Sequence, residues 1–205
     1  MSKTWETIPN AATFEKTVTA LKENGIDALI VDTAEQAKQK ALELLPAGAE
    51  VMDMTSITLE KLGLVKEIHE SGKYVSVKKK LFSMDRETQG EEMQKLGAAP
   101  QWAIGSVHAV THDGKVVIAS MTGSQLSGYV YGASHVIWIV GGQKIVENTD
   151  EGIKRIYEHT LPLESERAHK AYGIPGSSVN KLLIVNKEVQ PKRITMILVK
   201  EVLGF

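Results

Sequence analysis

Three short polar segments contain the residues best suited to bind a ligand, and each follows a predicted strand. The first spans residues 54–59, where Thr55, Ser56 and Thr58 supply hydroxyls in front of a helical pattern. Hydroxyls and backbone N–H groups at the start of a helix favour a bound anion, because the positive end of the helix dipole lies there. We therefore expect Ser56 and Thr58 to contact an anion, although a Ser56 that only caps the helix would give the same pattern.

The second segment spans residues 120–125 and contains a glycine between hydroxyl and amide side chains. Gly123 lets the backbone approach a ligand closely, and Thr122, Ser124 and Gln125 surround it with hydrogen-bonding groups. This pattern indicates a ligand-binding turn. The alternative is a plain helix start with Thr122 or Ser124 as the cap.

The third segment follows the continuous apolar run at residues 136–140. Gly141 and Gly142 permit an unusual turn, and Lys144 then supplies a cation that would neutralise an anion. A turn followed by a solvated lysine is the alternative. Because ligands of open α/β sheets bind beyond the carboxyl ends of the strands, we expect all three segments to line one crevice.

His108 is the best candidate for proton transfer, since an imidazole titrates near neutral pH. In an enzymatic mechanism it would act as the general base, with Asp53 or Glu60 assisting. His112 lies four residues further along a predicted strand and therefore on the same face, so the two imidazoles could share a metal ion. A structural pair is the alternative, and no metal site is expected because no third ligand is evident.

Two further polar clusters are interpreted as surface. Residues 78–80 are three lysines at the end of a predicted strand, a pattern typical of a solvated edge. Glu164, Glu166 and Arg167 are typical of the polar surface of a helix. The short signatures of α/β-hydrolases, zinc proteases, P-loop NTPases and dinucleotide-binding dehydrogenases do not occur in the sequence.

Composition removes several classes of function. The chain has 205 residues, 24 Lys and Arg against 25 Asp and Glu, a net charge of −1 and no cysteine. Without cysteine the chain forms no disulfide, thiolate metal site or cysteine-bound iron–sulfur cluster, and we expect no cofactor. The near-zero charge argues against binding nucleic acid. No apolar run approaches the roughly 20 residues of a membrane span, and residues 1–10 lack the apolar core of a signal sequence. A cytoplasmic protein without membrane contact is expected.

Helical and extended patterns alternate along the chain. Helices are predicted at residues 10–24, 34–45, 58–62, 65–71, 86–96, 123–131 and 149–159. Strands are predicted at residues 26–31, 50–54, 74–77, 136–140, 182–185 and 194–199, with a hairpin at 107–120 around an Asp-Gly turn. This order predicts an α/β fold, a three-layer sandwich with a mostly parallel sheet and an antiparallel hairpin insert. We expect one domain over residues 1–205, with helix 10–24 as an appendage.

Several segments carry a likeness to a known family, and together they span most of the chain. They are TLEKLGL (58–64), IGSVHAVTHDG (104–114), YGA (131–133), VGGQKIV (140–146), DEGIKR (150–155), RITMILV (193–199) and LGF (203–205). In their order and spacing the sequence resembles the LUD domain proteins, which are related to bacterial lactate-utilisation proteins. The resemblance implies a fold similar to ribose-5-phosphate isomerase, glucosamine-6-phosphate deaminase and coenzyme A transferases, whose crevice takes phosphates or coenzyme A.

The resemblance also adds residues to the expected site. Gly105 and Ser106 are included because relatives place a polar residue near the corresponding glycine, where this chain has Ala103 and His108. Asp53, Met54 and Thr55 stand where the phosphate loop of such relatives has glycines. A carboxylate nucleophile of the transferase type is not evident, and residues 171–180 lack the cysteine cluster of some short relatives.

Three functions follow as hypotheses. The first is an accessory subunit of the lactate-utilisation type that binds a small anionic metabolite or a nucleotide-like ligand, with an iron–sulfur oxidase subunit as partner. The second is an isomerase, coenzyme A transferase or hydrolase that acts on a phosphorylated sugar or acyl-coenzyme A. The third is a pure interaction protein, a homodimer or a partner of such an oxidase, in which the crevice is vestigial.

Overall fold

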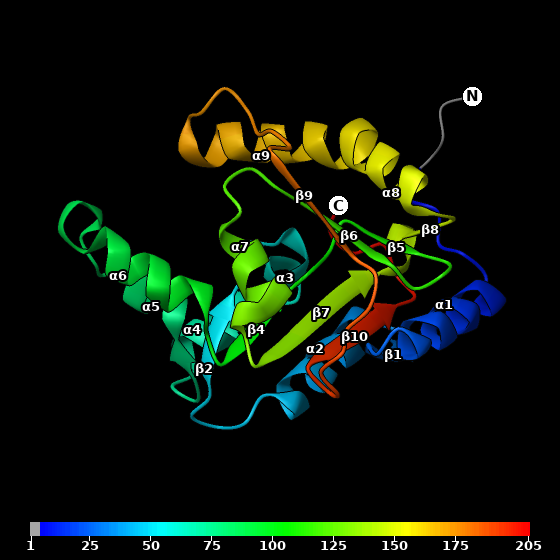
Figure 1. The fold of residues 1–205 in the computed structure, drawn as a ribbon, viewed down its shortest axis with the longest axis horizontal. Helices are drawn as coiled ribbons and strands as arrows, with labels where there is room; N and C mark the ends of the chain where they lie inside the picture. The colour runs from blue at the N-terminus through cyan, green and yellow to red at the C-terminus, as the bar shows by residue number, and fades with distance from the viewer. Residues whose placement is uncertain (1–4) are drawn as a thin grey trace.

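A six-stranded parallel sheet forms the centre of the computed structural model, which describes residues 5–205 (Figure 1). Its strands, in spatial order, are β1 (Asp27–Val31), β10 (Ile194–Val199), β7 (His135–Gly141), β4 (Trp102–Gly105), β2 (Glu50–Asp53) and β3 (Val75–Ser76). All neighbouring pairs are parallel, which confirms the predicted type of sheet. Strand β4 was not predicted, because four residues are too few to show a period.

The central strand β7 is buried on both faces, as its continuous apolar run predicts. Because side chains alternate along a strand, Val136, Trp138 and Val140 enter one hydrophobic cluster while Ile137 and Ile139 enter another. The main sheet therefore separates two hydrophobic cores.

Helices cover one face of the main sheet. They are α2 (Ala34–Leu44), α3 (Ile57–Lys61) and α4 (Leu64–Glu70). Helix α2 begins with a reciprocal capping box between Thr33 and Gln36 and buries Ala37 and Ala41 against this face. Small side chains at these positions let the helix backbone lie close to the strands.

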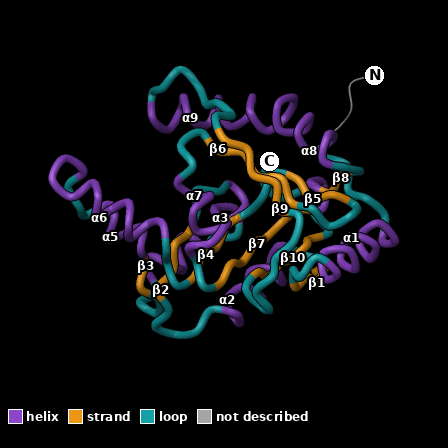
Figure 2. Tube along the Cα trace, viewed as in Figure 1, coloured by secondary structure: helices purple, strands orange, loops and turns teal. Residues whose placement is uncertain are grey.

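The opposite face is covered by helix α1 (Ala11–Glu23) and by a second sheet. The strands of the second sheet, in spatial order, are β8 (Ile145–Val146), β5 (Ala109–Thr111), β6 (Val116–Ser120) and β9 (Lys181–Val185). The predicted hairpin is confirmed as β5 and β6. The strand predicted at residues 182–185 is β9, which pairs antiparallel with β6 (Figure 2). The predicted hairpin is therefore part of a four-stranded sheet.

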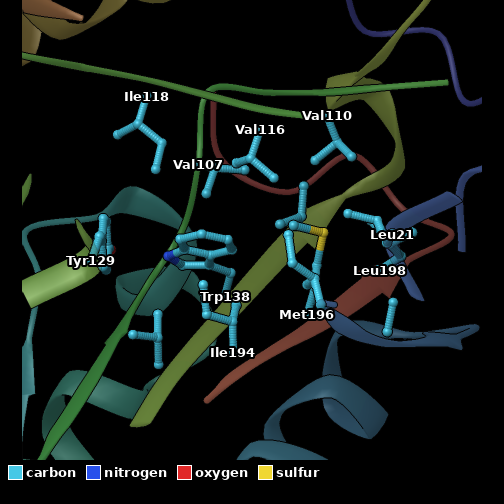
Figure 3. Packing of buried hydrophobic residues seen from close by; sticks show 14 of the residues in the cluster. Leu21, Val107, Val110, Val116, Ile118, Tyr129, Trp138, Ile194, Met196 and Leu198 are labelled. Atoms are coloured by element: carbon cyan, nitrogen blue, oxygen red, sulfur yellow. The ribbon is translucent and has the colours of Figure 1, made fainter. Parts of the chain in front are cut away.

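The two sheets pack through alternate side chains. Val110, Val116 and Ile118 point from the second sheet toward Trp138 and Met196 of the main sheet (Figure 3). The intervening residues of β5 and β6 point the other way into a third cluster with Ile156. Helix α1, predicted as an appendage, contributes Phe14, Val18 and Leu21 to the cluster between the sheets.

A long helical segment lies over the outer face of the second sheet (Figure 1). It consists of α8 (Thr149–Arg155), the π-helical turn η3 (Ile156–Thr160) and α9 (Leu161–Tyr172). The helix predicted at residues 149–159 is confirmed but continues beyond its predicted end through α9, which contains the expected polar helix surface at Glu164, Glu166 and Arg167. Proline at residue 162 does not end the helix; it lies in the first turn of α9, directly after the π-helical turn η3, where the regular α-helical hydrogen-bond pattern is already interrupted.

The remaining helical segments are α5 (Val77–Phe82), α6 (Arg86–Ala98), α7 (Ser124–Ser127) and the π-helical turn η1 (Gly128–Gly132). Helix α5 packs against β2, α6 packs against α5, and α7 and η1 pack against α6. The strand predicted at residues 74–77 is confirmed as β3, which ends at Ser76 because α5 begins at Val77. Residues 1–4, part of the segment expected to lack a signal sequence, lie outside the described residues. Within residues 5–205, helices of the length and apolarity needed to cross a bilayer are absent.

Candidate functional site

A cavity of about 330 Å³ opens where the carboxyl ends of β2, β4 and β7 meet the end of β6. The segments that follow these strands form its floor, and α9 with the loop after it forms the opposite wall. The cavity thus lies at the predicted edge of the sheet. This agrees with the rule that open α/β sheets bind ligands beyond the carboxyl ends of their strands.

Eight of the predicted site residues line this cavity. They are Ser56, Thr58, Ser106, His108, Thr122, Ser124, Gln125 and Lys144. Ser56 begins α3 but its side chain makes no capping hydrogen bond, so the capping interpretation does not explain it. The structure therefore brings hydroxyls from all three predicted segments to one place.

The four predicted glycines do not line the cavity, and three of them, Gly105, Gly141 and Gly142, allow close packing elsewhere. A Cβ at Gly105 would lie 1.8 Å from the Tyr129 hydroxyl, and one at Gly142 would lie 2.4 Å from Cζ of Phe14. Gly141 is packed just as closely, since a Cβ there would lie 2.2 Å from Oε1 of Gln143. Their role in this structure is to let β4 and β7 fit against neighbouring elements.

Gly123 has a different role, at the start of helix α7. It adopts a left-handed conformation with φ of 89°, which glycine reaches without strain. Its N–H donates to Oγ of Ser120 at 2.9 Å, and Thr122 accepts from the N–H of Ser124 at 3.3 Å. Gly123 thus turns the chain so that Thr122 and Ser124 reach the cavity.

Lys144 is a buried cation-forming group with only hydroxyl partners. Its side chain is 1% exposed, and Nζ lies 3.0 Å from Oγ of Ser106 and 3.4 Å from Oγ1 of Thr58. Burial, reinforced by the positive charges of Arg155 and Lys61, lowers the pKa of the Lys144 amine well below its ordinary value of 10.5. The interpretation of Lys144 as a solvated lysine is therefore wrong.

The turn that carries Lys144 is held by the last residues of the chain. Strand β7 ends at Gly141, and the short 3₁₀ turn η2 (Gly142–Lys144) directs Lys144 toward the cavity. The Gln143 side-chain amide donates to the carbonyl oxygens of Leu203 and Gly204 at 3.2 and 3.0 Å, while its oxygen accepts from the Leu203 N–H at 3.2 Å. These bonds fix the turn, so Lys144 reaches the cavity from a rigid support.

His108 lines the cavity as a neutral imidazole. Its Nδ1 accepts a hydrogen bond from the backbone N–H of Ala119 at 3.1 Å, which places the ring proton on Nε2. Burial, with the positive charges of Lys144 and Arg155, lowers the pKa of His108 to about 3. In this geometry His108 is suited to donate a hydrogen bond from Nε2.

Arg155 supports His108 from behind the cavity. Its Nη1 donates to the carbonyl oxygen of His108 at 2.8 Å and to Oγ1 of Thr160 at 3.1 Å. Burial lowers the pKa of Arg155 to about 10, which leaves it charged at neutral pH.

His112 lies outside the cavity, and no group of three or more potential metal ligands occurs within residues 5–205.

Asp53 lines the cavity but is already paired. Its carboxylate accepts from Nε2 of His69 at 2.8 Å and from Nζ of Lys78 at 3.4 Å, and Lys78 also reaches Oγ1 of Thr55 at 3.3 Å. The expected solvated edge is wrong for Lys78, because this residue lies in α5 and faces the cavity. Glu60 is exposed, so neither proposed assistant makes a direct bond to His108.

Helix α9 adds charged residues that sequence patterns placed on an outer surface. Nε and Nη2 of Arg167 donate to the two carboxylate oxygens of Glu164, each at 2.7 Å. The guanidinium also lies over the ring of Tyr172 at 5.5 Å from its centre. The three-residue spacing of Glu164 and Arg167 indicates one helix face, but only the tertiary structure shows that this face lines the cavity.

Comparisons with known proteins agree with this architecture. A family model described as the LUD domain matches residues 14–199. A crystal structure of a DUF162 family protein from Deinococcus radiodurans is similar, with a TM-score of 0.53 and 13% sequence identity. The similarity covers 94% of this chain and 99% of that one, and at this identity it shows the shared fold. No curated protein matches the sequence.

Proposed function

From the premise that this chain belongs to the LUD domain family, we propose that it binds a small organic anion in the cavity at the ends of β2, β4 and β7. One observation carries this proposal, namely the balance of charged groups in the cavity wall. Three basic side chains, Lys78, Lys144 and Arg167, face two carboxylates, Asp53 and Glu164. An anionic ligand would supply a third negative group to match the three basic side chains.

The two carboxylates do not offset Lys144, because each has a partner of its own. Asp53 is bonded to His69 and Lys78, and Glu164 to Arg167. Among residues 5–205, no ion pair joins a carboxylate to Lys144. A buried amine of lowered pKa can take up a proton when an anion binds beside it, since an opposite charge favours the ammonium form.

The size and lining of the cavity support a metabolite rather than a macromolecule. A volume of about 330 Å³ is at the lower end of the range typical of small-molecule sites, roughly 300 to 1,000 Å³. The hydroxyls of Ser56, Ser106 and Ser124 supply neutral hydrogen-bond partners on several sides. We expect a carboxylate or phosphate compound of the size of a 2-hydroxy acid or a phosphosugar to fit best.

A ligand screen by thermal unfolding tests the proposal. The probes are lactate, ribose 5-phosphate, acetyl-coenzyme A and AMP at millimolar concentration, and at least one should raise the Tm because it binds the folded state alone. The Arg167→Met variant should weaken that ligand at least tenfold in calorimetry. Lys170→Met is the matched control on the same helix, since Lys170 is exposed and lies outside the cavity.

Two results would contradict the proposed anion site. If none of the four compounds raises the Tm, or if Arg167→Met and Lys170→Met weaken binding equally, the cavity is not an anion site. The role as an accessory subunit of an iron–sulfur oxidase also remains a proposal, which derives from the family resemblance. Capture of an iron–sulfur oxidase subunit by the tagged protein from its native host would support that role, and its absence would count against it.

A further inference from the structure

Ser106 and Lys144 form a hydroxyl–amine pair on the floor of the cavity. Oγ of Ser106 and Nζ of Lys144 are 3.0 Å apart, a normal hydrogen-bond distance. We propose that this pair is a catalytic dyad in which Ser106 attacks the acyl carbon of a bound ester, thioester or amide and Lys144 is the general base. This proposal rests on the proposed function, because the anionic part of the substrate would bind in the same cavity.

The positions of Ser106 and Lys144 relative to the cavity fit these roles. Ser106 is partly exposed and lines the cavity, whereas Lys144 is 1% exposed and lies against its hydroxyl. A substrate therefore meets the serine oxygen first. The opposite assignment, with Lys144 as the attacking nucleophile, would require a substrate to reach an amine that has almost no exposed surface.

Thr58 orients the amine for this purpose. Its hydroxyl donates to the carbonyl oxygen of Leu203 at 3.3 Å, so its oxygen is left to accept an N–H of Lys144 at 3.4 Å. The lone pair of a neutral amine is then free to accept the hydroxyl proton of Ser106. This is the arrangement that an activated nucleophile needs: a base in hydrogen-bond reach, itself held by a third group.

The surroundings of Lys144 favour the neutral amine that a base must be. The described residues provide no carboxylate partner, and burial together with the positive charges of Arg155 and Lys61 lowers the pKa of the amine. In the adjacent polar pair Asp53–Lys78, by contrast, the lysine has a carboxylate to hold its proton. The two cavity lysines are therefore suited to different tasks.

The reaction balances with these groups alone. The Ser106 oxygen forms a bond to the acyl carbon while its proton passes to Nζ of Lys144, and the carbonyl oxygen becomes an oxyanion. Collapse breaks the bond to the leaving oxygen, sulfur or nitrogen, which takes the proton from Lys144. Water then attacks the Ser106 ester with Lys144 again as base, and the carboxylic acid and the free serine are regenerated. The Nε2–H of His108, in the same cavity wall, is a neutral donor suited to the oxyanion.

The backbone around Ser106 is held firmly, as a nucleophile requires. It follows the buried end of β4, where the Tyr129 ring leaves space only for glycine at residue 105. Val107 on the other side is buried in the core between the sheets. Ser106 thus sits between two fixed residues, and its hydroxyl position is determined by the fold.

Covalent labelling with a small alkyl fluorophosphonate tests the dyad. This reagent forms a phosphorus–oxygen bond to an activated serine with loss of fluoride, and intact-mass and peptide mass spectrometry locate the adduct. We expect one adduct on Ser106 in the unaltered protein, none in Ser106→Ala, and at least about 100-fold slower labelling in Lys144→Met, the range of a lost general base. Ser83→Ala removes an exposed hydroxyl outside the cavity and should label at the wild-type rate.

The outcomes separate this inference from the proposed function. No adduct on Ser106, or equal labelling of Ser106 and Ser124, would overturn the dyad even if an anion raises the Tm. An adduct on Lys144 instead of Ser106 would assign the nucleophile to the amine and also overturn it. If Ser106 labels but no anion binds, the dyad stands and the anionic part of the substrate is wrong. Because the unaltered protein gives the first result, failure of a variant to fold does not decide the test.

Discussion

Two buried clusters of positive charge lie in different parts of the molecule and are satisfied in opposite ways. Near the start of β10, the Arg193 guanidinium donates to Glu188 at 2.6 Å and to the backbone carbonyls of residues 128, 129 and 133, each at 3.0 Å. At the cavity, Lys144 has two hydroxyl partners; behind it, Nε and Nη2 of Arg155 make no hydrogen bond within residues 5–205. Each cluster is almost completely buried.

The difference indicates what each cluster contributes. A buried charge with a carboxylate and a full set of acceptors stabilises the fold, because its desolvation is offset by good geometry. A buried basic group without a bonded carboxylate is costly to keep charged in the free protein. Such a group is expected where function requires it, and Lys144, unlike Arg193, lines the cavity. Removing members of each cluster should therefore have opposite effects.

The largest effect is expected for Arg193→Met. The variant leaves Glu188 partly buried without its cation and three buried carbonyl oxygens without their donor. We expect the free energy of unfolding to fall by about 3 to 5 kcal/mol, the range for breaking a buried pair. Urea denaturation at pH 7 measures it, with the exposed Lys187→Met as control. A loss below 1 kcal/mol would remove the contrast between the clusters.

An intermediate effect is expected for Asp53→Asn, where the cavity contains a paired charge. Asp53 is fully buried, but its partners His69 and Lys78 each keep 18% of their side-chain surface exposed. They can regain water when the carboxylate is lost, so we expect a loss of about 2 kcal/mol, near the cost of one charged hydrogen bond. Asp27→Asn, at an exposed strand end, is the control, and an equal loss in both variants would contradict this explanation.

Sequence patterns predicted those helices and strands whose apolar residues form a long run or a clear stripe along one face. The apolar run at 136–140 was enough to predict a strand covered on both faces, and helix 34–45 was confirmed as α2 with one fewer residue at its C-terminal end. Strand β4 and the extent of helix α9 were not predicted, for different reasons. β4 is too short to show a period. In α9 only a polar helix surface at Glu164, Glu166 and Arg167 was expected, because Ala168 as the one buried residue gives too weak an apolar stripe to mark the whole helix.

The candidate site was predicted at its strand ends but not in its opposite wall. Residue types after a strand indicate a ligand edge, which found Ser56, Ser124 and Lys144, whereas Ser106 came from the family resemblance. Burial of Lys144 follows from the 3₁₀ turn and from bonds to residues 203 and 204, sixty positions away along the chain, which no local pattern contains. Likewise, Lys78 faces the cavity only because α5 begins where a strand was expected to end.

A smaller effect is expected from His108, on how the free energy of unfolding depends on pH below 7. The ordinary pKa of a histidine is 6.5, and that of His108 is lowered to about 3 in the folded protein. Between these values the unfolded chain binds a proton that the folded protein does not, so stability falls as pH is lowered, by at most about 1.4 kcal/mol per pH unit. His108→Asn keeps an acceptor for the Ala119 N–H and should lose this slope.

Urea denaturation of both proteins at pH 7, 6, 5 and 4.5 isolates the effect, because the carboxylates titrate in both and cancel in the difference. His112→Asn is the control, since His112 lies outside the cavity. A constant difference between wild type and His108→Asn over this range would mean that His108 is protonated in the folded state. The positive surroundings of His108 would then not govern its charge.

The smallest change in stability is expected for Lys144→Met, which makes it the sharpest contrast with Arg193→Met. Methionine has similar length and no charge to desolvate, so at pH 7 the variant should be at least as stable as wild type, within about 1 kcal/mol. The unfolded chain keeps the Lys144 proton up to the ordinary pKa of 10.5, whereas the folded protein releases it at lower pH. Wild type therefore gains stability relative to the variant as pH rises toward 10.5. Urea denaturation at pH 7 and pH 9 measures both quantities, and a loss of 3 kcal/mol at pH 7 would show that Lys144, like Arg193, is a structural charge.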